Sequence, residues 1–358
     1  MSPPVAVFAH RGASAWLPEH TLAAYARAMA DGADAIEPDL VSTSDGVLVA
    51  RHENEISVTT DVASHPEFAY RRTRKCIDGE WLEGWFTEDF SLSELKTLRV
   101  RERLPHLRGS AWDGQFCIPT FDEILDLVST QARTGQRAIG VVPEIKHPSH
   151  FQRCGLAMEQ ATLKALQGRI WPPSAPLMIQ SFEVGNLRHL RRLMGDDRRI
   201  QLLQLIGNAD ARPADSRLAY REMLTPAGLA RIATYADAIG VEKTAVMGCD
   251  ATGRLSAPSS VTADAHAAGL NVVVYTFRPE NSFLPGIWRE GAPAQRNENG
   301  AQNELAQFLA AGIDAVFADD PGLARQAVDA VTPSSSGVTA LFERLQVPSV
   351  SGVFTAGS

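Results

Sequence analysis

Histidine, arginine and carboxylate side chains that could act on a phosphate ester gather between residues 10 and 53. His10 and Arg11 follow one apolar run, Glu37 and Asp39 lie on the next, and His52 follows a third. Histidine moves protons near neutral pH, and arginine binds phosphate through its planar fork. Carboxylates spaced i, i+2 lie on one face of a strand and can share a cation. Together these residues indicate cleavage of a phosphate ester.

A second pair of charged residues, Glu144 and Lys146, repeats the i, i+2 spacing at the end of a later apolar run. Both side chains are therefore expected on one face of a strand. The spacing is also compatible with a simple ion pair. In the company of Glu37 and Asp39, Glu144 would be a third carboxylate, and Lys146 would be a positive charge for the phosphate. Three carboxylates without a nearby cysteine favour one hard divalent cation, Ca2+ or Mg2+.

Two further acidic residues lie next to these candidates. Glu53 directly follows His52, and it either orients that ring or is simply solvated. Glu19 belongs to Pro18-Glu19-His20-Thr21, which is expected to start the first helix. A carboxylate at a helix N-terminus is stabilised by the helix dipole, which explains at least half of the preference for Glu19 there.

The elements that must position these side chains alternate between short apolar strands and Ala/Leu-rich helices. Residues 5–9 and 35–41 are expected strands, and residues 151–166 an expected helix. The Asp45-Gly46 turn can pair residues 47–50 with the second strand. About eight such units predict an α/β fold, a (β/α)8 TIM barrel with its active site at the carboxyl ends of the strands. A doubly wound open sheet is less favoured because no glycine-rich loop follows the first strand.

Two segments break the alternation of strands and helices. Residues 54–118 carry several tryptophans and many charges, and we expect an inserted cap region after the second strand. Residues 279–300 are expected to be a second insertion that ends in a mobile, amide-rich loop. The chain is thus expected to form a single barrel domain over residues 1–330, followed by a tail over residues 331–358 with one short helix, Thr339–Leu345.

Composition narrows the classes of partner. The chain has 358 residues and a formal net charge of -8, which argues against general nucleic-acid binding. Its four cysteines are scattered, so a zinc or redox site is not expected. No apolar run is long enough for an integral membrane segment. The N-terminus has no signal-peptide pattern, so we expect a cytoplasmic protein, or a periplasmic one if a signal has been removed. The oligomeric state is left open.

An ordered set of motifs resembles the glycerophosphodiester phosphodiesterase family over residues 5–330. The matching residues are His10-Arg11-Gly12, Pro18-Glu19-His20-Thr21, Glu37-x-Asp39, Asp45-Gly46, His52, Pro143-Glu144-Ile145-Lys146, Gln180-Ser181-Phe182 and Ala318-Asp319-Asp320-Pro321. The bacterial, periplasmic-type branch is the most similar, because it shares three further motifs in the same order. These are Leu17 before Pro18-Glu19-His20-Thr21, Thr60-Asp61-Val62 and Gln204-Leu205-Ile206.

The resemblance implies a (β/α)8 barrel with an insertion after the second strand. It implies metal-dependent hydrolysis of a small glycerophosphodiester to sn-glycerol 3-phosphate and an alcohol, with His10 and His52 as general acid and base. Arg11 and Lys146 would bind the phosphate. Residues matching Glu37, Asp39 and Glu144 would hold the divalent cation. The family usually has aspartate at the position of Glu53.

Three other functions compete with this interpretation. A barrel phospholipase of the C or D type would act on lipid phosphodiesters and would need an apolar, exposed mouth. A binding protein that has lost its chemistry would not be expected to retain both histidines and all three acids. A glycosidase could use paired acids, but would not explain His10, Arg11, His52 and Lys146 together.

Overall fold

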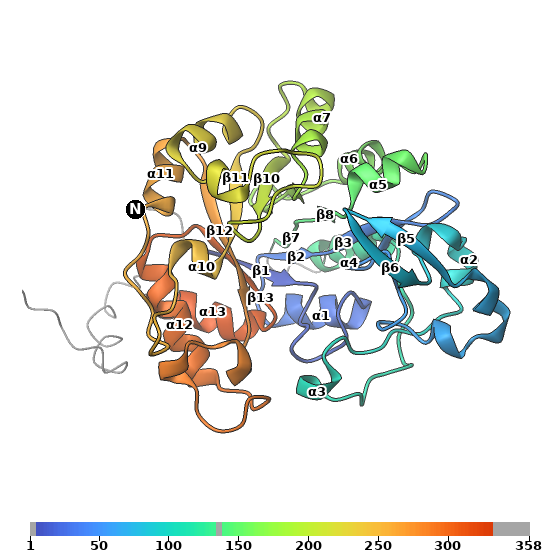
Figure 1. The fold of residues 1–358 in the computed structure, drawn as a ribbon, viewed down its shortest axis with the longest axis horizontal. Helices are drawn as coiled ribbons and strands as arrows, with labels where there is room; N and C mark the ends of the chain where they lie inside the picture. Colours follow the sequence, from blue (N-terminus) through green and yellow to red (C-terminus); the bar gives the residue numbers. More distant parts are fainter. Residues whose placement is uncertain (1–4, 134–137, 332–358) are drawn as a thin grey trace, which may run out of the picture.

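The strands of the chain close into a parallel barrel with helices around it (Figure 1). The computed structural model describes residues 5–133 and 138–331. Each barrel strand pairs with its neighbours in parallel, and β13 pairs with β1 to complete the ring. The strands of the barrel are β1 (Ala6–His10), β2 (Ala35–Glu37), β3 (Asp39–Ser42), β7 (Gly140–Val141), β8 (Glu144–Ile145), β9 (Met178–Ser181), β10 (Gln201–Ile206), β11 (Ala238–Glu242), β12 (Asn271–Phe277) and β13 (Ala315–Ala318).

Two prolines divide the second and third barrel strands without opening the ring. Pro38 separates β2 from β3, and Pro143 separates β7 from β8, because proline has no N–H to donate to the ladder. β2 pairs with β7, and β3 pairs with β8. The carbonyls of Pro38 and Pro143 still accept hydrogen bonds from the amides of Glu144 and Gln180. Within the described residues the barrel thus has eight strand positions, as the sequence predicted.

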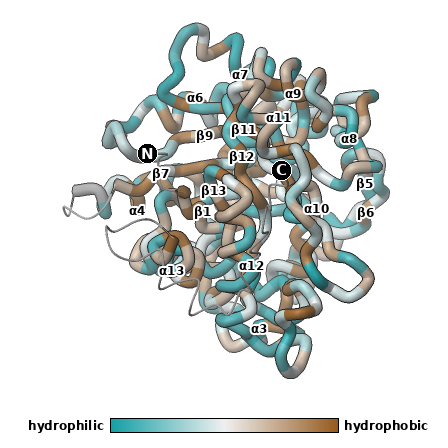
Figure 2. The backbone as a smooth tube through the Cα atoms, turned by 90° about the vertical axis from the view of Figure 1, so that its left-hand side faces the viewer, coloured by the Kyte–Doolittle hydropathy of each residue, from teal (hydrophilic) through white to brown (hydrophobic). Residues whose placement is uncertain are grey.

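Helices cover the outside of the barrel, and apolar side chains fill both of its layers. Inside, Phe8, Leu203 and Phe317 belong to one buried cluster, while a larger cluster lies between strands and helices. In Figure 2 the hydrophobic colour follows strands such as β7 and β9. The helices are α1 (Leu22–Ala30), α4 (Phe121–Arg133), α5 (Pro148–Arg153), α6 (Glu159–Gln167), α7 (Val184–Met194), α8 (Tyr220–Met223), α9 (Pro226–Ile232), α10 (Lys243–Val246), α11 (Val261–Ala267), α12 (Glu298–Ala310) and α13 (Pro321–Val331).

The region between β4 (Leu48–Ala50) and α4 lies beside the second barrel strand. β4 pairs antiparallel with β3 across the predicted Asp45-Gly46 turn, and the amide of Ser44 bonds to the carbonyl of Phe90. Residues 54–118 add no strand to the barrel; their hairpin forms a separate two-stranded sheet. The elements of this region are η1 (Val62–Ser64), η2 (Pro66–Arg71), β5 (Thr73–Ile77), β6 (Glu80–Gly84), η3 (Thr87–Asp89), α2 (Leu92–Leu95) and α3 (Pro105–Arg108).

Two local predictions were wrong. The single helix expected over residues 151–166 is two helices, α5 and α6, because Gly155 adopts a left-handed conformation with φ of 74° and ends the first. The mobile loop expected to run to Gly300 is shorter, because Asn297 caps α12, accepting a hydrogen bond from the Gly300 amide.

The expected tail helix Thr339–Leu345 lies outside the described residues. Among the residues that the structure describes, no helix is long and apolar enough to cross a bilayer. Two short 3-10 helices, η4 (Asn281–Phe283) and η5 (Gly286–Trp288), lie in the segment before α12.

Candidate active site

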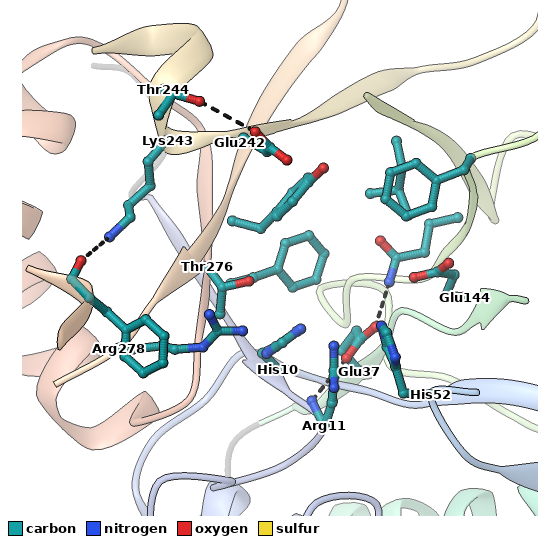
Figure 3. Close-up of a pocket in the computed structure, with 16 residues that line it drawn as sticks. His10, Arg11, Glu37, His52, Glu144, Glu242, Lys243, Thr244, Thr276 and Arg278 are labelled. Carbon is teal, nitrogen blue, oxygen red and sulfur yellow. Dashed lines mark hydrogen bonds between the residues drawn. The ribbon is translucent and has the colours of Figure 1, made fainter. Parts of the chain in front are cut away.

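A cavity of about 350 Å³ opens at the carboxyl ends of the barrel strands (Figure 3). Its floor carries most of the residues that the sequence singled out, and its opposite side carries residues from β11, β12 and the loops after them. The lining residues are His10, Arg11, Glu37, His52, Glu144, Gln180, Phe182, Leu205, Glu242, Lys243, Thr244, Tyr275, Thr276, Arg278, Phe283 and Phe317.

A tight turn after β1 directs His10 and Arg11 into this cavity. Arg11 and Gly12 both adopt positive φ angles, of 59° and 90°. A Cβ atom on Gly12 would lie 2.8 Å from the Cβ atom of Ala24, on α1. Glycine is therefore needed at this position, both for its backbone conformation and for the close approach of the turn to the helix.

Three buried carboxylates meet at one side of the cavity. Glu37, Asp39 and Glu144 each offer an oxygen within 4.8 Å of the others. Burial, reinforced by the other two acids, raises the pKa of Glu37 well above its usual range, and burial raises that of Glu144 to about 8. Burial opposes ionisation of Asp39 too, but Lys146 and a hydrogen bond from His20 hold its pKa well below the usual range. Such a cluster needs a proton or a cation to compensate its charge.

The surroundings of the carboxylates fit a cation. Within the described residues, Oδ1 of Asp39 is buried and has no hydrogen-bond partner. Gln180 donates from Nε2 to Oε1 of Glu37 over 2.9 Å, which orients that carboxylate. Oxygen ligands without sulfur match a hard cation such as Ca2+ or Mg2+.

His20 is a residue whose role sequence reasoning missed. Its Nε2 atom lies 2.9 Å from Oδ2 of Asp39, and its Nδ1 atom lies 2.7 Å from the hydroxyl of Tyr25. The ring is fully buried, so it positions Asp39 rather than contacting a substrate. The motif Pro18–Thr21 was a signal for it, but its spacing alone did not show which acid His20 contacts.

The two predicted histidines line the cavity, and each is backed by a carboxylate. Nδ1 of His10 lies 2.6 Å from Oδ1 of Asp319, and Nδ1 of His52 bonds to Oε1 of Glu53. Ionised carboxylates only accept hydrogen bonds, so we assign the proton to Nδ1 in both rings. No described residue bonds to either Nε2 atom. Glu53 therefore orients His52, which sequence had left open, whereas the contact of Asp319 was not foreseen.

Both histidines are neutral at neutral pH. Burial, with the nearby charge of Arg11, lowers the pKa of His10 to about 4 despite the contact with Asp319. Burial and the charges of Arg11 and Lys146 lower the pKa of His52 to about 3. A neutral imidazole with a free Nε2 can accept a proton, and its protonated form can return one.

Arg11 and Lys146 place fixed positive charges beside the acids. Arg11 donates from Nη1 to Oε2 of Glu19 over 2.8 Å, and its backbone amide donates to Glu37. Nζ of Lys146 lies 2.9 Å from Oε1 of Glu144, so the two side chains make the contact considered from the sequence. The helix-dipole explanation of Glu19 was wrong, because α1 begins at Leu22 and Glu19 precedes its cap.

Arg278 is a cation that the sequence did not reveal. It lines the cavity, and its Nε atom lies 3.0 Å from Oδ2 of Asp319 (Figure 3). No motif or spacing singled it out, since it reaches Asp319 only when β12 and β13 lie side by side.

The site combines two histidines, a buried acidic cluster and two buried positive charges, a combination that suits the hydrolysis of a phosphoric diester. Together with the barrel, the site indicates a phosphoric diester hydrolase. Comparison with known proteins agrees. Residues 10–323 match the model of the Glycerophosphoryl diester phosphodiesterase family. The chain belongs to this family, and both the family and the barrel predicted from the sequence are confirmed.

Curated relatives support the family assignment, and solved structures support the fold. The chain is 35% identical over 289 residues to the glycerophosphodiester phosphodiesterase GDPD6 of Arabidopsis thaliana, covering 77% of this chain and 75% of that protein. It is 30% identical over 257 residues to the Haemophilus influenzae enzyme, covering 65% and 68%. A phosphodiesterase of Oleispira antarctica, solved with the product sn-glycerol-3-phosphate, shares the fold with a TM-score of 0.58 and 21% identity, covering 91% and 97%. A glycerophosphodiester phosphodiesterase of Thermotoga maritima shares the fold with a TM-score of 0.52 and 19% sequence identity; the match covers 91% of this chain and 99% of that one.

Proposed function

We propose that the chain hydrolyses glycerophosphodiesters to sn-glycerol 3-phosphate and an alcohol, with His10 and His52 as general acid and base and one divalent cation, Ca2+ or Mg2+. The observation that carries the proposal is that two carboxylate-backed histidines line one cavity together with Glu37 and Glu144, two of the three clustered acids. The related structure from Oleispira antarctica holds sn-glycerol-3-phosphate, the product expected here.

Each histidine has the arrangement that proton transfer requires. Asp319 and Glu53 fix the Nδ1–H tautomers, so that Nε2 of each ring is left for the substrate. One ring removes a proton from the attacking hydroxyl at its Nε2 atom. The other ring, neutral in the protein without substrate, must first take up a proton at Nε2, which the negative charge of the bound phosphodiester favours, before it donates that proton to the leaving alcohol. The charge of the proton-donating ring is stabilised by the carboxylate behind it.

Positive charges would bind the phosphoryl oxygens. Arg11 lines the cavity, and the ammonium of Lys146 lies 2.9 Å from Oε1 of Glu144, which lines it; both cations are largely buried. Glu37, Asp39 and Glu144 would hold the cation, which when bound stabilises negative charge on the phosphoryl group. Because the site is sheltered from water, these charges act more strongly than they would in solution.

The attacking group in this proposal is the substrate's own 2-hydroxyl, which yields a cyclic phosphate before water opens it. Two histidines suit this route because they can exchange roles between the two steps. A diester without a hydroxyl next to the phosphate should then be a poor substrate. Its efficient cleavage would mean that water attacks directly.

The substrate assay tests the proposal as a whole. Glycerophosphocholine and its ethanolamine, glycerol and inositol counterparts should each release sn-glycerol 3-phosphate, measured with a coupled dehydrogenase. The cavity, at about 350 Å³, suits small diesters of this size. Phospholipid vesicles serve as the comparison, and cleavage of the vesicles in preference to the soluble diesters would support the phospholipase alternative instead.

The charge balance of the acidic cluster predicts that cation binding is linked to proton release. Glu144, with its pKa raised to about 8, carries a proton at pH 7 in the cation-free protein. Glu37, whose pKa is also raised, contributes in the same direction. Binding of Ca2+ should therefore release protons, and affinity should rise as the pH increases from 7 through about 8. Calorimetry in two buffers with different ionisation enthalpies measures the number of protons released, and identical heats in both buffers would contradict the expectation.

A further inference from the structure

One short segment outside the barrel reaches both histidine–carboxylate pairs. The segment is residues 103–108, which ends in helix α3 and belongs to the region between β4 and α4. Its two arginines, Arg103 and Arg108, point toward opposite sides of the candidate active site, as their contacts show. Neither arginine lines the cavity, so neither is placed to touch a substrate.

Arg103 clamps the carboxylate behind His52. Its Nη1 atom donates to Oε1 of Glu53 over 2.9 Å, and its Nη2 atom donates to Oε2 over 2.5 Å. The remaining nitrogen of the guanidinium, Nε, donates to Oε1 of Glu19 over 2.8 Å. Glu19 in turn pairs with Arg11, so Arg103 is anchored to the buried wall of the site.

Arg108 clamps the carboxylate behind His10. Its Nη2 atom donates to Oδ2 of Asp319 over 2.6 Å, while Oδ1 of the same carboxylate faces Nδ1 of His10. Nε of Arg108 donates to Glu280 over 2.7 Å, and Nη1 donates to the carbonyl of Ser14 over 2.8 Å. Its side chain is only 9% exposed.

We propose that Arg103 and Arg108 are positioning residues that hold Glu53 and Asp319 against the two histidines, so that this one segment sets both proton-transfer groups. The inference rests on the proposed roles of His10 and His52. Neither the family assignment nor the cavity itself assigns any role to the two arginines.

The physical reason is that a carboxylate aligns a ring only while it is itself held. Glu53 is 31% exposed at its side chain, and a glutamate has three rotatable bonds, so without a partner it would exchange between solvent and His52. The bidentate guanidinium of Arg103 fixes both oxygens of Glu53 in one plane. Arg108 donates one hydrogen bond to Oδ2 of Asp319, an oxygen that also accepts from Arg278. Burial opposes ionisation of both acids. His52 and then Arg103 keep the pKa of Glu53 low, and Arg278 and then Arg108 keep that of Asp319 low, so that both acids stay ionised acceptors.

The experiment reads the histidine rings directly. Protein with ¹⁵N-labelled histidine is studied by long-range ¹H–¹⁵N NMR, which distinguishes the two tautomers of a neutral ring, with signals assigned by His10→Asn and His52→Asn. We expect the Nδ1–H form at both rings in the wild type. Arg103→Gln should convert His52 to a tautomer mixture and leave His10 unchanged, and Arg108→Gln should do the reverse.

Kinetics gives a second readout. Each glutamine variant should lose about 10- to 100-fold in kcat with little change in KM, because the histidines are misaligned while the phosphate contacts remain. Arg103→Lys keeps the charge and should recover part of the loss. Arg72→Gln is the matched control, since Arg72 lies in the same region but pairs with Glu83 on the surface, and neither ring signals nor kcat should change.

Several outcomes would overturn the inference. Unchanged ring signals at His52 in a folded Arg103→Gln variant would do so, even if kcat fell. If Arg108→Gln does not fold, Arg108→Met takes its place, because it keeps an unbranched side chain but can donate no hydrogen bond to Asp319, and an unaltered His10 signal with normal kcat would count against Arg108. The NMR result does not depend on turnover, so it distinguishes failure of this inference from failure of the proposed catalytic roles. If only the catalytic roles were wrong, the tautomers would still shift in the arginine variants, but the histidine variants would keep their activity.

Discussion

Replacing His10 or His52 with alanine should lower kcat for glycerophosphodiester hydrolysis by about 10² to 10⁴-fold, the usual contribution of a general acid or base. Each ring lines the cavity with its Nδ1 atom bound to a carboxylate, so no other described histidine can replace it there. KM should change less, because Arg11 and Lys146, the proposed phosphate-binding residues, are left intact. Steady-state kinetics with glycerophosphocholine measures both constants.

The same variants can show which histidine is the acid. A diester with a p-nitrophenyl leaving group needs little protonation, so the variant lacking the acid should lose far less activity on it than on glycerophosphocholine. His266→Ala is the control, because His266 lies on α11 outside the cavity, pairs with Asp314 and is 41% exposed at its side chain. Near wild-type rates for both His10→Ala and His52→Ala would refute the acid–base assignment.

Removal of divalent cations should reduce turnover by about 10³-fold, which corresponds to the several kcal/mol of charge stabilisation expected of a bound cation. Glu37, Asp39 and Glu144 converge within 4.8 Å, and in the described structure Oδ1 of Asp39 has no partner of its own. Asp39→Asn should have a comparable effect, because it removes a charge from the cluster while keeping the shape. Activity is measured after exhaustive chelation and again after Ca2+ or Mg2+ is added.

The two additions decide between the cations, since the one that restores turnover at lower concentration is the better fit. Glu298→Gln is the matched acidic control, because Glu298 is exposed on α12 and lies outside the cavity. Full turnover by protein shown to be metal-free would mean that the acidic cluster serves another purpose. A loss on chelation that neither cation restores would point to damage rather than to a cation requirement.

Much of the fold could be predicted from the sequence because it depends on local patterns. Apolar runs alternating with helical runs identify a parallel barrel, and Asp45-Gly46 identifies the β3–β4 hairpin that the structure shows. The break between α5 and α6 was missed because the left-handed conformation of Gly155 ended a helix that the apolar spacing seemed to continue. Two prolines interrupt neighbouring barrel strands, and β2 pairs with β7 while β3 pairs with β8. These pairings join distant parts of the chain, so no local sequence pattern predicts them.

For the candidate active site, the sequence by itself singled out the proposed reactive groups, which are two histidines, one arginine, one lysine and three acids in ordered motifs. It could do so because residues on one strand, such as Glu37 and Asp39, share a face by spacing alone. Only the tertiary structure decided what holds those groups. Asp319 reaches His10 across 309 residues of sequence, and Arg103 reaches Glu53 from a separate region. Such partners are chosen by closure of the barrel and by the need to pair every buried charge, and neither condition is written in the spacing of residues along the chain.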